Sequence, residues 1–161
     1  MNVYRALTMA VPLAALLAAP APAVERAAPW GTATPAETSY EPDKVVYDVA
    51  VDSPERLERL LDRASFLANL YAGDPFEAAI VLVLHGPEVQ YFAVKNIDRY
   101  KALMERAQSL TVGGMISIRM CQVAAKARGL DPKDIHGFVQ LVPMGDAEII
   151  RLQQQGHAYM Q

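Results

Sequence analysis

The sequence contains one cysteine, Cys121, at a point where a strand is expected to give way to a helix. Residues 115–120 form a short apolar run typical of a strand, and residues 122–128 have a helical pattern that ends at Gly129. The unpaired N–H groups at the start of a helix stabilise a thiolate. Because the chain has no second cysteine for an internal disulfide, Cys121 is either an inert core residue or a reactive thiol.

Two other segments with residues suited to chemistry also follow predicted strands. His85 and Gly86 come directly after the apolar run 78–84, and Gly145 follows the next-to-last predicted strand. Open α/β sheets bind ligands outside the carboxyl ends of their strands. If these strands are neighbours, His85 and Cys121 line one cleft together with the backbone of Gly145. A histidine beside a thiol can stabilise the thiolate and move protons.

These patterns give two candidate catalytic residues, Cys121 and His85, and three candidate ligand contacts, Asn69, Gly86 and Gly145. Each has a structural alternative. His85 can serve as a capping histidine in a tight His-Gly-Pro turn, and Asn69 can hydrogen-bond a neighbouring loop. None of the spacings is a specific catalytic motif by itself.

Other chemistries find little support in the sequence. His136 and His157 have no cysteine or carboxylate at ligand spacing, so we predict neither a metal site nor a cofactor. A hydrolase is disfavoured because Ser117 lies in no Gly-x-Ser-x-Gly elbow and no Ser/His/Asp set is evident.

The first 23 residues have the pattern of a secretory signal peptide. Arg5 is their only charge, residues 7–19 are almost continuously apolar, and residues 21–23 supply an Ala-x-Ala cleavage site. The apolar run is short for a membrane span, which needs about 20 residues. We therefore expect a mature chain that begins near Val24 in the periplasm or outside the cell; the alternative is an uncleaved N-terminal anchor.

The mature chain divides into a leader and one domain. Residues 24–43 are rich in Ala, Pro, Thr and Glu and are expected to form a flexible leader. Residues 44–161 have the size of a single domain with one core.

The charge of the mature chain excludes some partners. Removing Arg5 from the 15 basic residues leaves 14 against 18 acidic ones, a net charge of −4. The sequence has no Lys/Arg cluster that could follow a phosphate backbone, which argues against nucleic acid. It has no basic amphipathic face either, so we predict no membrane contact beyond the signal peptide.

Hydrophobic periodicity predicts an α/β fold in which strands and helices alternate. Asp52-Ser53-Pro54-Glu55 is a clear helix start, with a capping side chain and a proline in the first turn. The alternation favours a mostly parallel sheet of about five strands with helices on both faces. The expected strands are 45–51, 78–84, 115–120, 138–142 and 157–160, and the expected helices are 54–71, 97–110, 122–128 and 146–155.

Six segments, 44–47, 67–70, 83–89, 118–121, 142–153 and 156–159, together span nearly all of residues 44–161. Taken together, they resemble the DsrE family. The resemblance is closest to a branch of small DsrE-like proteins, distinct from the subunits of sulfur oxidation and tRNA thiolation. It implies a Rossmann-like, three-layer α/β/α domain that assembles as trimers or hexamers. It also implies that Cys121 matches the cysteine that carries sulfur as a persulfide in sulfur-trafficking members.

The leading hypothesis is an exported DsrE-like protein that handles sulfane sulfur or a small anionic ligand, with Cys121 as the candidate persulfide carrier. It would exchange sulfur with a donor or acceptor protein. The competing hypothesis is a non-catalytic, oligomeric module that binds a small ligand; whether the protein is an enzyme depends on Cys121. We expect the apolar run Val89–Val94, Phe92 included, to contribute to subunit contacts, unless it packs on the core instead.

Overall fold

The structure is a computed structural model that describes residues 28–71 and 78–161. The predicted signal peptide and the start of the mature chain at Val24 lie outside the described residues. Residues 28–43 contain no helix or strand. No helix in the described ranges is long and apolar enough to cross a membrane.

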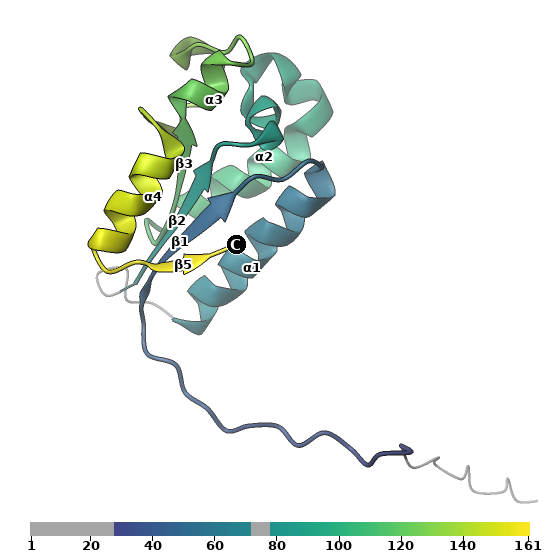
Figure 1. Ribbon diagram of the computed structural model, residues 1–161. Helices are drawn as coiled ribbons and strands as arrows, with labels where there is room; N and C mark the ends of the chain where they lie inside the picture. Colours follow the sequence, from purple (N-terminus) through teal and green to yellow (C-terminus); the bar gives the residue numbers. More distant parts are fainter. Residues whose placement is uncertain (1–27, 72–77) are drawn as a thin grey trace, which may run out of the picture. The chain divides into compact units, whose positions relative to one another are not determined.

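A five-stranded, wholly parallel sheet forms the centre of the domain, with strand order β4-β3-β2-β1-β5 (Figure 1). β2 is apolar on both faces, as a central strand covered on both sides should be. The five strands are β1 (Lys44–Val49), β2 (Ala79–Leu84), β3 (Ile116–Cys121), β4 (Val139–Val142) and β5 (Ala158–Met160).

Helices cover both faces of the sheet, so the predicted three-layer α/β/α architecture is confirmed (Figure 1). The first helix begins as the sequence indicates, because the Ser53 hydroxyl accepts the N–H of Arg56 at 3.3 Å and Pro54 occupies the first turn. The helices are α1 (Pro54–Leu70), α2 (Ile97–Thr111), α3 (Gln122–Lys126) and α4 (Gly145–Gln154), with short 3₁₀ turns η1 (Pro87–Phe92), η2 (Val94–Asn96) and η3 (Pro132–Asp134).

The sheet separates two groups of buried side chains. The larger lies on the face covered by α1 and α2 and contains Val45, Tyr47 and Val49 of β1. The smaller lies under α4 and contains Val46 of β1, Val81 and Val83 of β2, and Ile149 and Leu152 of α4. This alternation along β1 and β2 determines which face each polar strand residue joins.

Two expectations need correction. The helix after Cys121 is shorter than predicted, because α3 ends at Lys126 and the chain then turns to Gly129, whose φ of +69° favours glycine. The run Val89–Val94 is mostly core: Val89 and Phe92 are fully buried within η1. Phe92 therefore stabilises the monomer and offers no surface to another subunit.

Candidate functional site

The carboxyl ends of β2 and β3 bring His85 and Cys121 to the same edge of the sheet. Leu84 pairs with Met120 in register, and the next residues of the two strands are His85 and Cys121. The N–H of His85 donates to the carbonyl of Val49 at 3.1 Å, which extends the pairing of β1 and β2 by one residue. The position of His85 is thus set by two strands.

Gly145, the first residue of α4, packs directly against both residues. A Cβ atom at Gly145 would lie 3.0 Å from the Cβ of His85 and 3.3 Å from the Cβ of Cys121. These distances are shorter than ordinary van der Waals contacts, so a glycine here lets the backbone of α4 approach the two side chains. The three residues therefore meet, as expected if their strands are neighbours.

Cys121 caps α3 with its own sulfur. The N–H of Ala124 donates to Sγ of Cys121 at 3.4 Å. The cysteine is 5% exposed, but it lines a cavity of about 250 Å³ together with His85, Arg128 and Gly145. The thiol is thus enclosed by protein on most sides and open to one cavity, which is lined by a histidine, a guanidinium and the carboxylate of Asp146.

Asp48, on β1, orients the imidazole. Nε2 of His85 hydrogen-bonds Oδ1 of Asp48, and the Tyr159 hydroxyl donates to Oδ2 of the same carboxylate at 2.5 Å. Burial raises the pKa of Asp48, but the hydrogen bonds from Tyr159 and His85 outweigh it, so its pKa lies below the ordinary value. A carboxylate only accepts, so Nε2 carries the hydrogen, and Nδ1 is the basic nitrogen of the neutral ring.

Gly86 has a structural role at this edge. A Cβ at Gly86 would lie 2.6 Å from Cα of Ala50, so no larger residue fits without a shift of the backbone. Glu88, fully buried, accepts the N–H of Gly86 at 2.8 Å and the N–H of Val51 at 2.9 Å. Burial raises the pKa of Glu88, and these hydrogen bonds oppose the rise. Glu88 thus joins the ends of β1 and β2 below His85.

Asn69 is the one candidate that the structure places elsewhere. It lies in the last turn of α1 with an exposed side chain. α1 starts at the carboxyl end of β1 and runs back towards the start of β1. Asp43, just before β1, is close enough to Tyr71, just after α1, to add to the rise that burial causes in its pKa. Asn69 is therefore at the opposite end of the sheet from Cys121.

Two residues of this site, Asp48 and Arg128, were not predicted from the sequence. The available signal for Asp48 was an acidic residue inside the apolar run of β1. The period-two alternation of a strand places Asp48 on the same face as Val46. Its register with Val83 places it beside β2. Arg128 carried no such signal. Within the described ranges, no group of three or more His, Cys, Asp or Glu side chains is placed to hold a metal ion.

Comparison with known proteins identifies the domain. The family model of the DsrE/DsrF-like family matches residues 44–161. The chain belongs to the DsrE/DsrF-like family. No curated protein matches the chain.

Among solved structures, this DsrE-like domain is similar to MTH1491 from Methanobacterium thermoautotrophicum, described as a protein of unknown function. The two share 21% identity at a TM-score of 0.60, over 73% of this chain and 97% of the other. At this identity, the likeness concerns the fold alone. The domain therefore has a DsrE-like fold in a family implicated generally in sulfur relay.

Proposed function

We propose that this DsrE-like protein carries sulfane sulfur as a persulfide on Cys121, and that it does so after export to the periplasm. The observation that supports this most is the position of the thiol. Sγ accepts a main-chain N–H at 3.4 Å and lines a cavity with His85 and Arg128. N–H donors and cations stabilise a thiolate, which is the form of cysteine that attacks sulfur.

The neighbouring side chains suit each part of that reaction. Because Nε2 of His85 bonds Asp48, Nδ1 is the nitrogen that can accept the thiol proton. The thiolate then attacks the outer sulfur of a persulfide R–S–SH: an S–S bond forms to Cys121, the S–S bond of the donor breaks, and R–S⁻ leaves. Arg128 is the cation in the cavity that can balance the charge of a bound persulfide anion.

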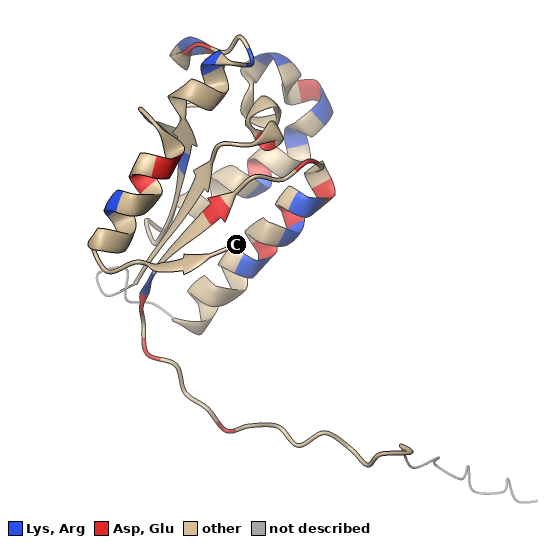
Figure 2. Cartoon of the chain, viewed as in Figure 1, with Lys and Arg blue, Asp and Glu red and all other residues tan. Residues whose placement is uncertain are grey.

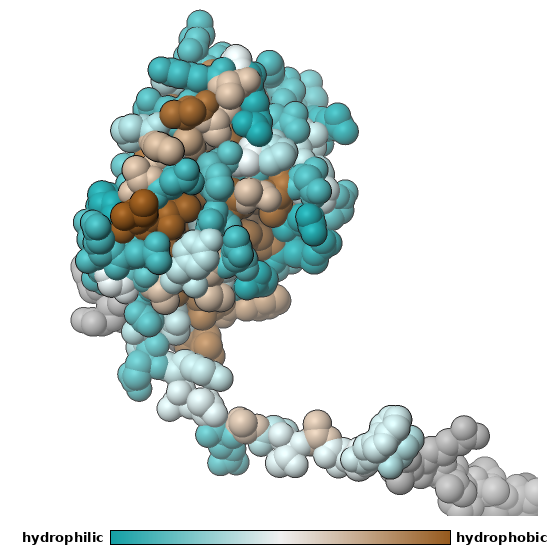
Figure 3. All heavy atoms as spheres, in the orientation of Figure 1, coloured by the Kyte–Doolittle hydropathy of each residue, from teal (hydrophilic) through white to brown (hydrophobic). Residues whose placement is uncertain are grey.

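The surroundings of the cavity also suit exchange with another protein. Val123 and Met144 line it and are 60% and 48% exposed. Figure 3 shows hydrophobic side chains gathered on the surface over α4 and near α3. Exposed apolar side chains beside a reactive group favour contact with a sulfur donor or acceptor protein, or with further subunits.

The test is the intact mass of the mature protein before and after incubation with polysulfide. We expect a gain of about one sulfur atom, reversed by a thiol reductant and absent in Cys121→Ser. Alkylation by iodoacetamide of the folded protein should modify Cys121 and block the gain.

Resistance of Cys121 to both reagents until the protein is denatured would overturn the proposal. The alternative function, a non-catalytic module that binds a small ligand, would then account better for the fold. A full-length product that still begins at Met1 in membrane fractions would contradict the export part alone.

A further inference from the structure

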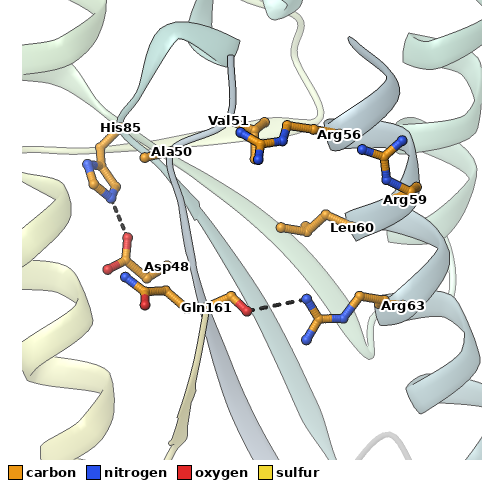
Figure 4. Close-up of a pocket in the computed structure, with 9 residues that line it drawn as sticks. All are labelled: Asp48, Ala50, Val51, Arg56, Arg59, Leu60, Arg63, His85 and Gln161. Carbon is orange, nitrogen blue, oxygen red and sulfur yellow. Dashed lines mark hydrogen bonds and ion pairs between the residues drawn. The ribbon is translucent and has the colours of Figure 1, made fainter. Parts of the chain in front are cut away.

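A second, larger cavity lies at the carboxyl end of β1, on the side away from Cys121. Its volume is about 550 Å³, and Figure 4 shows its lining residues. β5 pairs with β1 only as far as Tyr47, so the end of β1 has no strand beside it on this edge. The first half of α1 forms the opposite wall. The lining residues are Asp48, Ala50, Val51, Arg56, Arg59, Leu60, Arg63, His85 and Gln161.

α1 separates its charges so that its basic side chains face this cavity. Acidic and basic residues both occur along α1 (Figure 2). Arg56, Arg59 and Arg63 are spaced by three and four residues, which places them on one side of a helix, and all three line the cavity. Glu58 lines a different cavity, and Asp62 pairs with an arginine of α2 at 3.2 Å.

The three guanidinium groups make few or weak interactions with other described residues. Arg63 donates to the main-chain oxygen of Gln161 at 3.3 Å and lies 5.6 Å from the centre of the Tyr47 ring. Arg56 pairs with Asp52 at 3.1 Å, but both side chains are more than half exposed, so the pair contributes little. Arg59 makes no hydrogen bond or ion pair with any other described residue.

The opposite wall contributes little opposing side-chain charge. Among the described residues, Asp48 is the one acidic side chain that lines the cavity, and both of its oxygens are engaged, by His85 and by Tyr159. The described side chains that line the cavity therefore carry an excess of positive charge. Between the charged groups, Val51 and Leu60 provide an apolar surface.

We propose that this cavity binds an elongated organic anion with an acidic group at each end. Residues seven apart on a helix are separated by about 10 Å, so Arg56 and Arg63 can each engage one acidic group, with Arg59 between them. Guanidinium groups bind carboxylates and phosphates in a forked geometry. A volume of about 550 Å³ suits an organic molecule with a carbon skeleton.

The inference does not depend on sulfur chemistry at Cys121. The two cavities share one wall, because His85 lines both. An anion bound among the arginines would thus lie one side chain away from the cavity of the thiol. Cys121→Ser should leave its binding unchanged, so failure of the carrier proposal and failure of this proposal can be told apart.

The test is a titration of the mature protein with dianions of different length, in which nuclear magnetic resonance monitors binding. Suberate holds two carboxylates far apart, hexane-1,6-diyl bisphosphate holds two phosphates at a similar separation, and malonate holds two carboxylates close together. We expect one or both of the long anions to bind at least about fivefold more tightly than malonate, the effect of roughly 1 kcal/mol. The long anion that binds more tightly identifies the acidic group.

Two variants and a control locate the site. Arg59→Gln changes an exposed side chain that has no partner among the described residues, and it should weaken binding of the long anion at least about fivefold. The double change R59Q/R63Q should abolish it. Arg99→Gln, on α2 and in the lining of a different cavity, should change nothing. Equal affinity for long and short anions, or unchanged binding in Arg59→Gln, would overturn the proposal.

Discussion

Asp48 decides what the imidazole of His85 can do. Its carboxylate fixes the hydrogen on Nε2 and leaves Nδ1 as the base. An asparagine at this position is neutral and can present its NH₂ group to the ring, which reverses the tautomer. The role proposed for His85 therefore rests on one charged neighbour.

We predict that Asp48→Asn slows alkylation of Cys121 about tenfold at pH 7.5, which corresponds to ~1.4 kcal/mol. The rate of iodoacetamide modification, followed by mass spectrometry, measures the effect. Asp52→Asn is a matched control, because Asp52 is an exposed acid nearby whose side chain pairs with Arg56 at the surface. If Asp48→Asn and the wild-type protein react at the same rate, the pair of Asp48 and His85 does not act on the thiol.

At the level of single residues, the sequence predicted the site residues that follow the strands, but it did not predict the residues that support them. Parallel strands end at a common edge, so His85, Cys121 and Gly145 were expected to meet if their strands were neighbours. Asp48 became recognisable only when the register fixed its face and its neighbour. Asn69 lies apart from this group because a helix that follows a strand returns to the opposite edge of the sheet.

Among the elements, α4 is fastened to the sheet by a partly buried ionic cluster. Glu148 of α4 accepts hydrogen bonds from Arg119 of β3 and from Arg151 one turn later, the latter at 2.7 and 2.9 Å. The hydrogen bonds from Arg151 lower the pKa of Glu148 most, burial opposes them, and Arg119 adds to the decrease, which brings the pKa to about 2. This cluster holds in place the helix whose first residue touches Cys121.

The lowered pKa has a consequence for acid stability. The ordinary pKa of 4.5 exceeds the folded value of about 2, so the stabilisation is complete above pH 4.5 and is lost as the pH falls towards 2. We predict that Glu148→Gln lowers the free energy of unfolding by about 1–3 kcal/mol at pH 7, because it leaves the mostly buried Arg119 without a counter-charge. Urea unfolding at pH 7 and pH 3 measures this difference, which should shrink at pH 3.

Glu105→Gln provides the control for that experiment. Glu105 forms an exposed pair with Lys101 at 3.8 Å, one turn away on α2. Its removal should change the free energy of unfolding by less than about 0.5 kcal/mol at either pH. A Glu148→Gln protein as stable as this control would contradict the role of the cluster.

Periodicity predicted each α-helix and strand that the structure describes in the sheet domain, but not the 3₁₀ turns, because these segments lack a period. The run Val89–Val94 reads as apolar throughout, and such a run fits a core as well as an interface. η1 turns it inward, so that Val89 and Phe92 fill the core beside α2. α3 ended early for a similar reason: five residues provide too little pattern to fix a helix end.

For the whole molecule, the burial of Phe92 means that other residues must form the surface through which subunits are expected to assemble. A polar residue at Phe92 would disrupt the monomer and so could not test assembly. Val123 and Met144 line the Cys121 cavity, and Ile150 lies further along α4, at 60%, 48% and 55% exposure. We propose that the protein assembles as a trimer or a hexamer through this surface, which would enclose the cavity between subunits.

We predict that light scattering at micromolar concentration gives a mass three or six times that of the mature chain, and that Ile150→Glu shifts the protein towards monomer. A charge at a buried apolar contact leaves an unpaired ion in the interface, whereas the same residue on the free monomer remains solvated. Phe66→Glu is the matched control, because Phe66 is 71% exposed on α1, away from the Cys121 cavity. A monomeric wild-type protein would overturn the assembly, and equal effects of the two variants would show that another surface forms the contact.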